Sequence, residues 1–258
     1  MTEPDGAQVI GDSTDTAAHR ALRWRVRPAA PRAAVLVLHG GEEHNLARPR
    51  RLNLPLLRMH GFLRALSRET AAEAIAIGTV RYRHRGWNGA RADAARDALA
   101  ALDELTGTLG PVPTVLVGHS MGGRAALRAA GHPAVTGLVA LAPWCPAEDP
   151  CDHLAGRDVL FLHGDRDTVT APADTRAFAA RSRAAGARVC GYTVTGSGHA
   201  MLQRIPDWHR ATTRLTTALL GLHPLPAETA SALALPPTSP EALALPLPHQ
   251  PRTGPARA

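Results

Sequence analysis

A serine framed by two glycines, Gly118-His119-Ser120-Met121-Gly122, constrains this sequence more than any other feature. The apolar residues 115–117 precede this run, and the helix-forming residues 123–127 follow it. That order predicts a strand, a sharp turn and a helix, with the serine on the turn. Because glycine has no Cβ, the two flanking glycines let strand and helix approach closely and tolerate a strained backbone. The pattern therefore predicts an α/β fold that presents a serine hydroxyl at the edge of a sheet.

The rest of the chain alternates strand-like and helix-like segments. Continuous apolar runs are typical of strands that are buried on both faces. The expected strands are residues 21–26, 33–38, 74–80, 114–117, 138–141, 158–162 and 188–194. Apolar residues at helical spacing predict helices at 54–66, 90–105, 121–130, 175–185 and 208–220. This alternation predicts a mostly parallel, doubly wound sheet with helices on both faces.

One folded domain is expected. The 258 residues suffice for a single α/β domain with a sizeable core, which we place at residues 21–222. Residues 1–20 predict a loose N-terminal tail. Residues 223–258 are rich in proline and alanine, and the sequence of 232–236 recurs at 242–246. Because repeated proline blocks helices and strand ladders, this C-terminal segment is predicted to be disordered.

The charge of the chain does not indicate a nucleic-acid partner. The formal net charge is +7, and all 29 basic residues are arginines. They are scattered, with small clusters only at 48–51 and 81–85, so a solvated basic surface is the simpler interpretation. No apolar run is long enough to cross a bilayer, and no signal peptide is recognisable at the N-terminus. We therefore expect a cytoplasmic protein without nucleic-acid or membrane partners.

The cysteines predict neither a disulfide framework nor a metal site. Cys145, Cys151 and Cys190 are too few for a disulfide-stabilised fold. Cys145, Cys151 and His153 lie close together in the sequence, but no second pair of metal-ligand residues accompanies them. Buried free thiols are the expected state. Neither a metal ion nor an organic cofactor is expected.

A serine hydroxyl becomes a useful nucleophile only beside a base that is oriented by an acid. Two later strand ends supply candidates: Asp165 and Asp167 lie in the loop after residue 162, and His199 lies in the loop after residue 194. In a parallel sheet both loops leave the same edge as the Ser120 turn. Serine, acid and histidine in this chain order predict a catalytic triad.

Together these motifs resemble the α/β-hydrolase superfamily over about residues 33–222. The resemblance rests on the 118–122 turn, on His163-Gly164-Asp165-Arg166-Asp167 and on Gly198-His199. It implies that Ser120 attacks an acyl carbon and that His199 takes the serine proton. It also implies that Asp167 holds the imidazolium that results.

The run His39-Gly40-Gly41, which follows a buried apolar strand, looks like the oxyanion turn of this superfamily. The backbone N–H groups of Gly41 and Met121 would then bind the developing oxyanion. Glu42 and Glu43 follow at once, which departs from the longer glycine run of the hormone-sensitive-lipase group. His39 itself has an alternative interpretation, as a packed residue that supports the loop.

The sequence leaves the acid and the base open to alternatives. Asp165 is two positions from Asp167 and equally acidic, and Asp149 follows the preceding strand, where some members of the superfamily place the acid. Ser120 has the alternative of merely filling a tight turn. His199 is one of 13 histidines in the chain.

The expected function is hydrolysis of a small-molecule carboxylic ester through an acyl-enzyme on Ser120. Only about fifteen residues separate the strand near 142 from the strand near 158, where many members of the superfamily insert a lid. The resemblance therefore implies a small serine hydrolase with no sizeable lid and an open cleft. Thioester hydrolysis, peptide hydrolysis, acyl transfer and non-catalytic binding remain alternatives. The substrate and the oligomeric state are left open.

Overall fold

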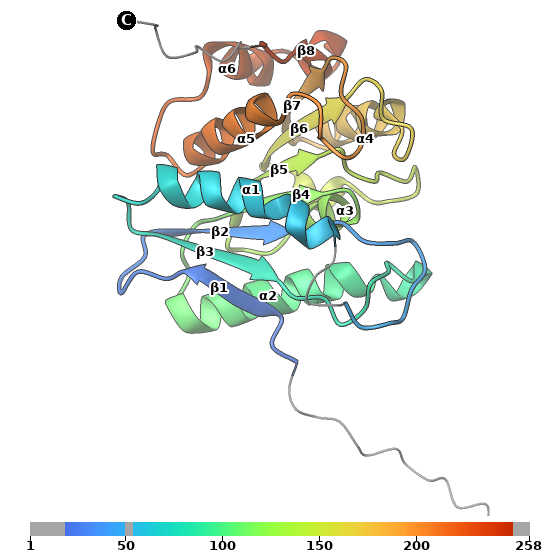
Figure 1. Ribbon diagram of the computed structural model, residues 1–258. Coiled ribbons are helices and arrows are strands. Elements are labelled where there is room, and N and C mark those ends of the chain that lie inside the picture. Colours follow the sequence, from blue (N-terminus) through green and yellow to red (C-terminus); the bar gives the residue numbers. More distant parts are fainter. Residues whose placement is uncertain (1–18, 50–53, 250–258) are drawn as a thin grey trace, which may run out of the picture.

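A computed structural model describes residues 19–49 and 54–249. Their strands form one eight-stranded sheet with the order β1-β3-β2-β4-β5-β6-β7-β8 (Figure 1). β1 runs antiparallel to β3, and all other neighbouring strands are parallel. The strands are β1 (Leu22–Val26), β2 (Ala33–Leu38), β3 (Ile75–Val80), β4 (Thr114–His119), β5 (Val135–Leu141), β6 (Asp158–Gly164), β7 (Arg188–Val194) and β8 (Leu245–Pro246).

Helices cover both faces of the sheet, as the alternating sequence predicts. The helices are α1 (Leu54–Glu69), α2 (Asp93–Leu109), α3 (Met121–Ala129), α4 (Pro172–Ala184), α5 (Ile205–Leu219) and α6 (Ala227–Ala234). α1, α5 and α6 pack on one face, and α2, α3 and α4 pack on the other (Figure 1). The mostly parallel, doubly wound fold is therefore confirmed.

The strand β2 illustrates why the sequence folds in this way. All six of its residues are buried. Ala34, Leu36 and Leu38 belong to the core beneath α2 and α3, whereas Val35 and Val37 belong to the core beneath α1 and α5. A strand that contributes to two cores has no polar face, which is the reason for its continuous apolar run.

The segment between β5 and β6 is short, as expected. Residues 142–157 contain a single 3-10 turn, η2 (Asp152–Leu154), and no inserted lid domain. In the part of the chain that the structure describes, no helix is long and apolar enough to cross a membrane.

The prediction of a disordered C-terminal segment is wrong for the described part of residues 223–258. After α6 the chain forms the 3-10 turn η3 (Pro240–Leu243) and then β8, which pairs in parallel with β7. Side chains from both copies of the repeat, among them Leu233 and Ala242, are buried in the core beneath α5. Proline has no backbone N–H to donate, and it is compatible with β8 because an edge strand has one side without a partner strand. Residues 1–18 and 250–258, which include most of the expected N-terminal tail, lie outside the described residues.

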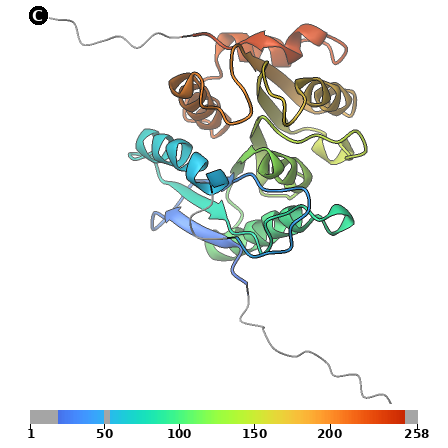
Figure 2. The same ribbon diagram turned by 45° about the vertical axis from the view of Figure 1, so that its right-hand side comes forward.

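A buried arginine ties this C-terminal segment to the domain. The Arg183 guanidinium donates hydrogen bonds to the carbonyl oxygens of Leu235 (2.8 Å), Pro236 (2.7 Å) and Pro237 (3.2 Å). It also donates to the Val189 carbonyl on β7, at 2.6 Å. Figure 2 shows the C-terminal segment at the sheet edge opposite to β1.

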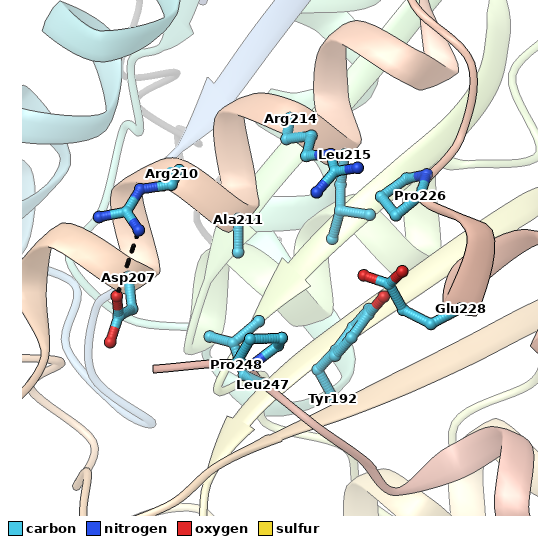
Figure 3. A pocket seen from close by; sticks show the side chains of 10 residues that line it. All are labelled: Tyr192, Asp207, Arg210, Ala211, Arg214, Leu215, Pro226, Glu228, Leu247 and Pro248. Atoms are coloured by element: carbon cyan, nitrogen blue, oxygen red, sulfur yellow. Dashed lines mark ion pairs between the residues drawn. The ribbon is translucent and has the colours of Figure 1, made fainter. Parts of the chain in front are cut away.

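The seam between this segment and α5 encloses a small cavity of about 60 Å³. Figure 3 shows Leu247 of the C-terminal segment near Ala211 and Leu215 of α5, with Tyr192 of β7 beside Leu247. The Tyr192 hydroxyl lies 2.6 Å from the Thr229 hydroxyl of α6. The segment is thus held by apolar contacts and hydrogen bonds along its length.

Candidate active site

Ser120 occupies a strained turn between β4 and α3. Its backbone has φ 57° and ψ −123°, in a region that residues with side chains rarely adopt. Strain of this kind persists where the surrounding structure enforces it, and it is concentrated at functional sites. The serine is 8% exposed, so the turn leaves it within reach of the surface.

The two glycines of the motif are required by backbone packing. A Cβ on Gly118 would lie 2.3 Å from the Gly122 carbonyl oxygen. A Cβ on Gly122 would lie 2.4 Å from the carbonyl oxygen of His39 at the end of β2. Both distances are far below van der Waals contact, so no larger residue fits without moving the backbone.

The three predicted triad residues meet at the carboxyl edge of the sheet. The Ser120 hydroxyl donates to Nε2 of His199 at 2.9 Å. Nδ1–H of His199 donates to Oδ2 of Asp167 at 2.8 Å. This geometry needs the imidazole tautomer that carries its proton on Nδ1, and the carboxylate selects that tautomer.

The Asp167 carboxylate is buried and held in its ionised form. Backbone N–H groups of Val169 (2.8 Å) and Thr170 (3.0 Å) donate to its Oδ1. Burial by itself would raise the pKa of Asp167. Hydrogen bonds from His163, from His199 and from the two backbone N–H groups outweigh burial and hold the pKa well below its usual range. The carboxylate is therefore charged at neutral pH and able to stabilise an imidazolium.

A second histidine supports the acid. His163, at the end of β6, is buried, and its Nε2–H donates to Oδ2 of Asp167 at 3.0 Å. Its Nδ1 accepts from the hydroxyl of Thr175, at 2.9 Å. His163 stands four residues before Asp167, but the sequence does not indicate that its ring turns back onto the carboxylate.

A third histidine supports the loop that carries the base. The Nε2–H group of His119 donates to the carbonyl oxygen of His199 at 3.1 Å, and the two rings lie 4.9 Å apart. Burial, and then the electrostatic effect of the nearby His199, lower the pKa of His119 to about 3. His119 is therefore neutral at physiological pH. It precedes Ser120 directly, yet sequence reasoning assigned it no role.

The two competing acids have other partners. Asp165 accepts a hydrogen bond from the backbone N–H of Gly196 at 2.7 Å, which links the β6 and β7 loops. Asp149 forms a two-pronged ion pair with Arg124, at 2.7 and 2.8 Å. Neither has a hydrogen bond to His199 among the described residues. The geometry thus brings Asp167, and not the alternatives, against the base.

The predicted oxyanion turn lies beside Ser120 and Met121. A Cβ on Gly41 would be 2.4 Å from Cε of Met121, so the two residues are in close contact. Among the described residues, the backbone N–H groups of Gly41 and Met121 donate no hydrogen bond to any other residue. His39 is buried, donates from Nδ1 to the Gly40 carbonyl at 2.6 Å and has its pKa lowered by burial. It therefore serves the loop as a packed support.

The three cysteines are free and buried. Burial raises the pKa of Cys145 and of Cys190 to about 12, so neither thiol is a ready nucleophile. Across residues 19–49 and 54–249, no group of three or more His, Cys, Asp or Glu side chains is arranged to hold a metal ion.

Solved structures share this architecture at low sequence identity. A candidate alpha/beta hydrolase from Agrobacterium tumefaciens aligns with a TM-score of 0.60 and 16% identity, over 80% of this chain and 93% of its own. A lidless α/β serine hydrolase from Xanthomonas campestris aligns with a TM-score of 0.53 and 18% identity, over 80% and 89%. A monoacylglycerol lipase from Paleococcus ferrophilus aligns with a TM-score of 0.53 and 16% identity, over 77% and 99%. These likenesses support the fold.

Sequence comparison decides the family. No curated protein matches the chain by sequence. A family model described as the alpha/beta hydrolase family matches residues 35–250, which is most of the chain. The resemblance drawn from the motifs is therefore confirmed, and the chain belongs to the alpha/beta hydrolase family.

Proposed function

We propose that this chain is a serine hydrolase that cleaves small carboxylic esters through an acyl-enzyme on Ser120. The observation that carries the proposal is the continuous chain of hydrogen bonds from the Ser120 hydroxyl through His199 to Asp167, at 2.9 and 2.8 Å. A hydroxyl in that setting loses its proton to the imidazole as it attacks.

Each residue has a defined task in the proposed reaction. His199 Nε2 takes the Ser120 proton while Oγ adds to the ester carbonyl, and Asp167 stabilises the imidazolium. The N–H groups of Gly41 and Met121 receive the negative charge that develops on the carbonyl oxygen. The imidazolium then protonates the leaving alcohol, and a water activated by His199 releases the acid.

Fluorophosphonate labelling followed by intact-mass measurement tests this function. The probe reacts only with an activated serine, so we expect one label per chain, lost in Ser120→Ala. Hydrolysis of an aryl acetate should disappear in the same variant. Ser231→Ala, at an exposed serine on α6, is the matched control and should retain both properties.

A folded chain that takes no label and hydrolyses no activated ester would support the alternative of a non-catalytic binding protein. Labelling with no ester hydrolysis would point to thioester, peptide or acyl-transfer chemistry on the same triad. Each of these results would overturn the ester assignment.

A further inference from the structure

A cavity of about 420 Å³ opens on the α2 and α3 side of the sheet. Its walls come from the loops that follow β2, β3 and β5 and from α3. These loops are tied to one another, since the N–H of Trp87 donates to the Glu42 carbonyl and the N–H of Asn88 donates to the Glu43 carbonyl, both at 2.9 Å. The cavity is therefore a formed feature of the fold.

Two residues of the cavity lining contact the backbone of Ser120. The Ser120 carbonyl accepts hydrogen bonds from the N–H of Arg124 at 3.1 Å and from the N–H of Trp144 at 3.2 Å. Both residues line the cavity. Glu43, another lining residue, is two residues from Gly41 of the predicted oxyanion turn. The lining of the cavity therefore reaches the turn that carries Ser120.

Arg124 is the unusual member of the lining. Its guanidinium carbon lies 3.9 Å from the ring centre of Trp87 and 4.2 Å from that of Trp144. Its Nε and Nη2 are bound to Asp149, and its side chain is 8% exposed. Nη1 donates no hydrogen bond to any described residue. A buried guanidinium held this firmly, with one nitrogen uncommitted, offers donors to an oxygen atom of a ligand.

The position of the base indicates which part of an ester would reach this cavity. His199 must protonate the leaving alcohol, so the alcohol lies on the His199 side of the scissile bond. None of the cavity's lining residues comes from the β7 loop that carries His199. The acyl group, which points away from the leaving alcohol, is therefore the part that faces the cavity.

We propose that this cavity is the acyl subsite and that Arg124 selects an uncharged acyl group with an oxygen acceptor, such as an ether, hydroxyl or carbonyl. The proposal rests on the ester chemistry proposed above. Because a buried donor is costly when it has no acceptor, a purely alkyl chain would be the poorer occupant.

The charges of the lining disfavour an acyl group whose oxygen acceptor is a carboxylate. Arg124 is already neutralised by Asp149. Of the other charged lining residues, Glu43 and Glu148 carry two negative charges, and Arg128 carries one positive charge. An anionic acyl group would meet this excess of negative charge together with the cost of losing its water. An uncharged oxygen acceptor meets neither penalty.

Three p-nitrophenyl esters with matched leaving groups test the proposal: the 4-methoxybutyrate, the hexanoate and the monoglutarate. The first two have acyl chains of equal length that differ only in one ether oxygen. The rate of alkaline hydrolysis of each ester, measured without protein, corrects for intrinsic reactivity. We expect the corrected kcat/KM for the 4-methoxybutyrate to exceed each of the other two by about tenfold.

Filling the cavity should remove this preference. Ala90 lines the cavity and is exposed on the 3-10 turn η1 (Gly89–Arg91), so Ala90→Phe adds bulk there with little risk to folding. We expect it to reduce the ratio of 4-methoxybutyrate to acetate hydrolysis by about tenfold or more. Ala177→Phe, at an exposed position of α4, is the matched control and should leave the ratio unchanged.

The outcomes separate the subsite from the ester function. If all three esters are hydrolysed and the hexanoate or the monoglutarate equals or exceeds the 4-methoxybutyrate, the subsite is wrong and the ester function stands. The same conclusion follows if Ala90→Phe and Ala177→Phe behave alike. If no ester is hydrolysed and Ser120 takes no fluorophosphonate label, the ester function is wrong and the acyl subsite falls with it.

Discussion

His163 lies directly against Asp167, with its Nε2 3.0 Å from the carboxylate oxygen Oδ2. That same oxygen receives the Nδ1–H of His199 at 2.8 Å. Two imidazole N–H groups thus donate to one buried carboxylate oxygen, which keeps the acid ionised and fixes its direction. In the proposed triad, His163 therefore holds the Asp167 carboxylate in place while the same carboxylate orients His199.

Replacing the carboxylate should impair catalysis without unfolding the protein. Asp167→Asn keeps the shape of the side chain but presents an amide N–H or a weaker acceptor to His199, which favours the wrong tautomer. We expect kcat for an aryl ester to fall by two orders of magnitude or more while the circular dichroism spectrum is retained. Asp174→Asn, at an exposed position in the first turn of α4, is the control and should keep its activity. A comparable loss in Asp149→Asn, with Asp167→Asn active, would contradict the assignment.

The neutral state of His119 should make stability depend on pH. In the fold its pKa is about 3, against 6.5 in an unfolded chain, so between these values the unfolded state binds an additional proton. Stability is lost as the pH falls, by about 1.4 kcal/mol per pH unit from this group once the pH is below 6.5. The fall in the free energy of unfolding between pH 7 and pH 5, measured by urea denaturation, should therefore be larger in wild type than in His119→Gln by roughly 2 kcal/mol.

The control for this pH dependence is His60→Gln, at an exposed position of α1, which should follow wild type. The glutamine amide at position 119 is still able to donate to the His199 carbonyl, so the variant separates the proton from the hydrogen bond. Equal pH dependence in wild type and His119→Gln would show that His119 takes no part in it.

The glycines of the turn should tolerate no side chain. Gly122→Ala places a Cβ 2.4 Å from the His39 carbonyl oxygen, and we expect it to destabilise the fold by several kcal/mol or to prevent folding. Gly107→Ala is the matched control, because a Cβ on this glycine of α2 meets nothing within 4 Å. It should stabilise the protein by about 0.5–1 kcal/mol, since alanine favours helix more than glycine does. Thermal melting of both variants measures the contrast.

Removing the C-terminal segment after Leu222 should destabilise the domain. The deletion exposes core previously covered by Leu233 and Leu247 and leaves the Arg183 guanidinium without most of its acceptors. We expect a loss of about 3 kcal/mol or more, which corresponds to roughly 10 °C in Tm. Arg183→Gln should reproduce part of this loss, and Arg176→Gln, exposed on the same helix, should not. An unchanged Tm in the truncated protein would mean that the segment contributes nothing.

Aryl esters with short acyl groups should be the best simple substrates. Residues 142–157 contain no inserted domain that would cover a long chain, and each methylene gains about 0.8 kcal/mol only if it leaves water. We expect kcat/KM to be highest for acyl groups of about two to six carbons, the length that we expect the proposed acyl subsite of about 420 Å³ to accommodate. A rise that continues to twelve carbons would show that a covered tunnel exists.

Local sequence patterns determined most of the fold. The apolar runs of β2 and β4 and the glycine-flanked turn at Ser120 reflect constraints that act within a few residues, and the structure places each where the sequence predicts it. The sheet edge that collects Ser120, Asp167 and His199 follows from the same patterns, because parallel strands end on the same side.

Tertiary packing decided what local patterns leave equivalent. Three acids, Asp149, Asp165 and Asp167, follow strands in the sequence. In the folded chain the Asp167 carboxylate contacts His199. The other two carboxylates bind Arg124 and the backbone of Gly196. The C-terminal repeat is predicted to be disordered because proline suppresses regular structure locally. Its leucines nevertheless pack in the core beneath α5, and its last strand pairs with β7. No local sequence pattern indicates these contacts. Burial and partner choice depend on residues distant in the chain, and this is why the sequence alone leaves them undetermined.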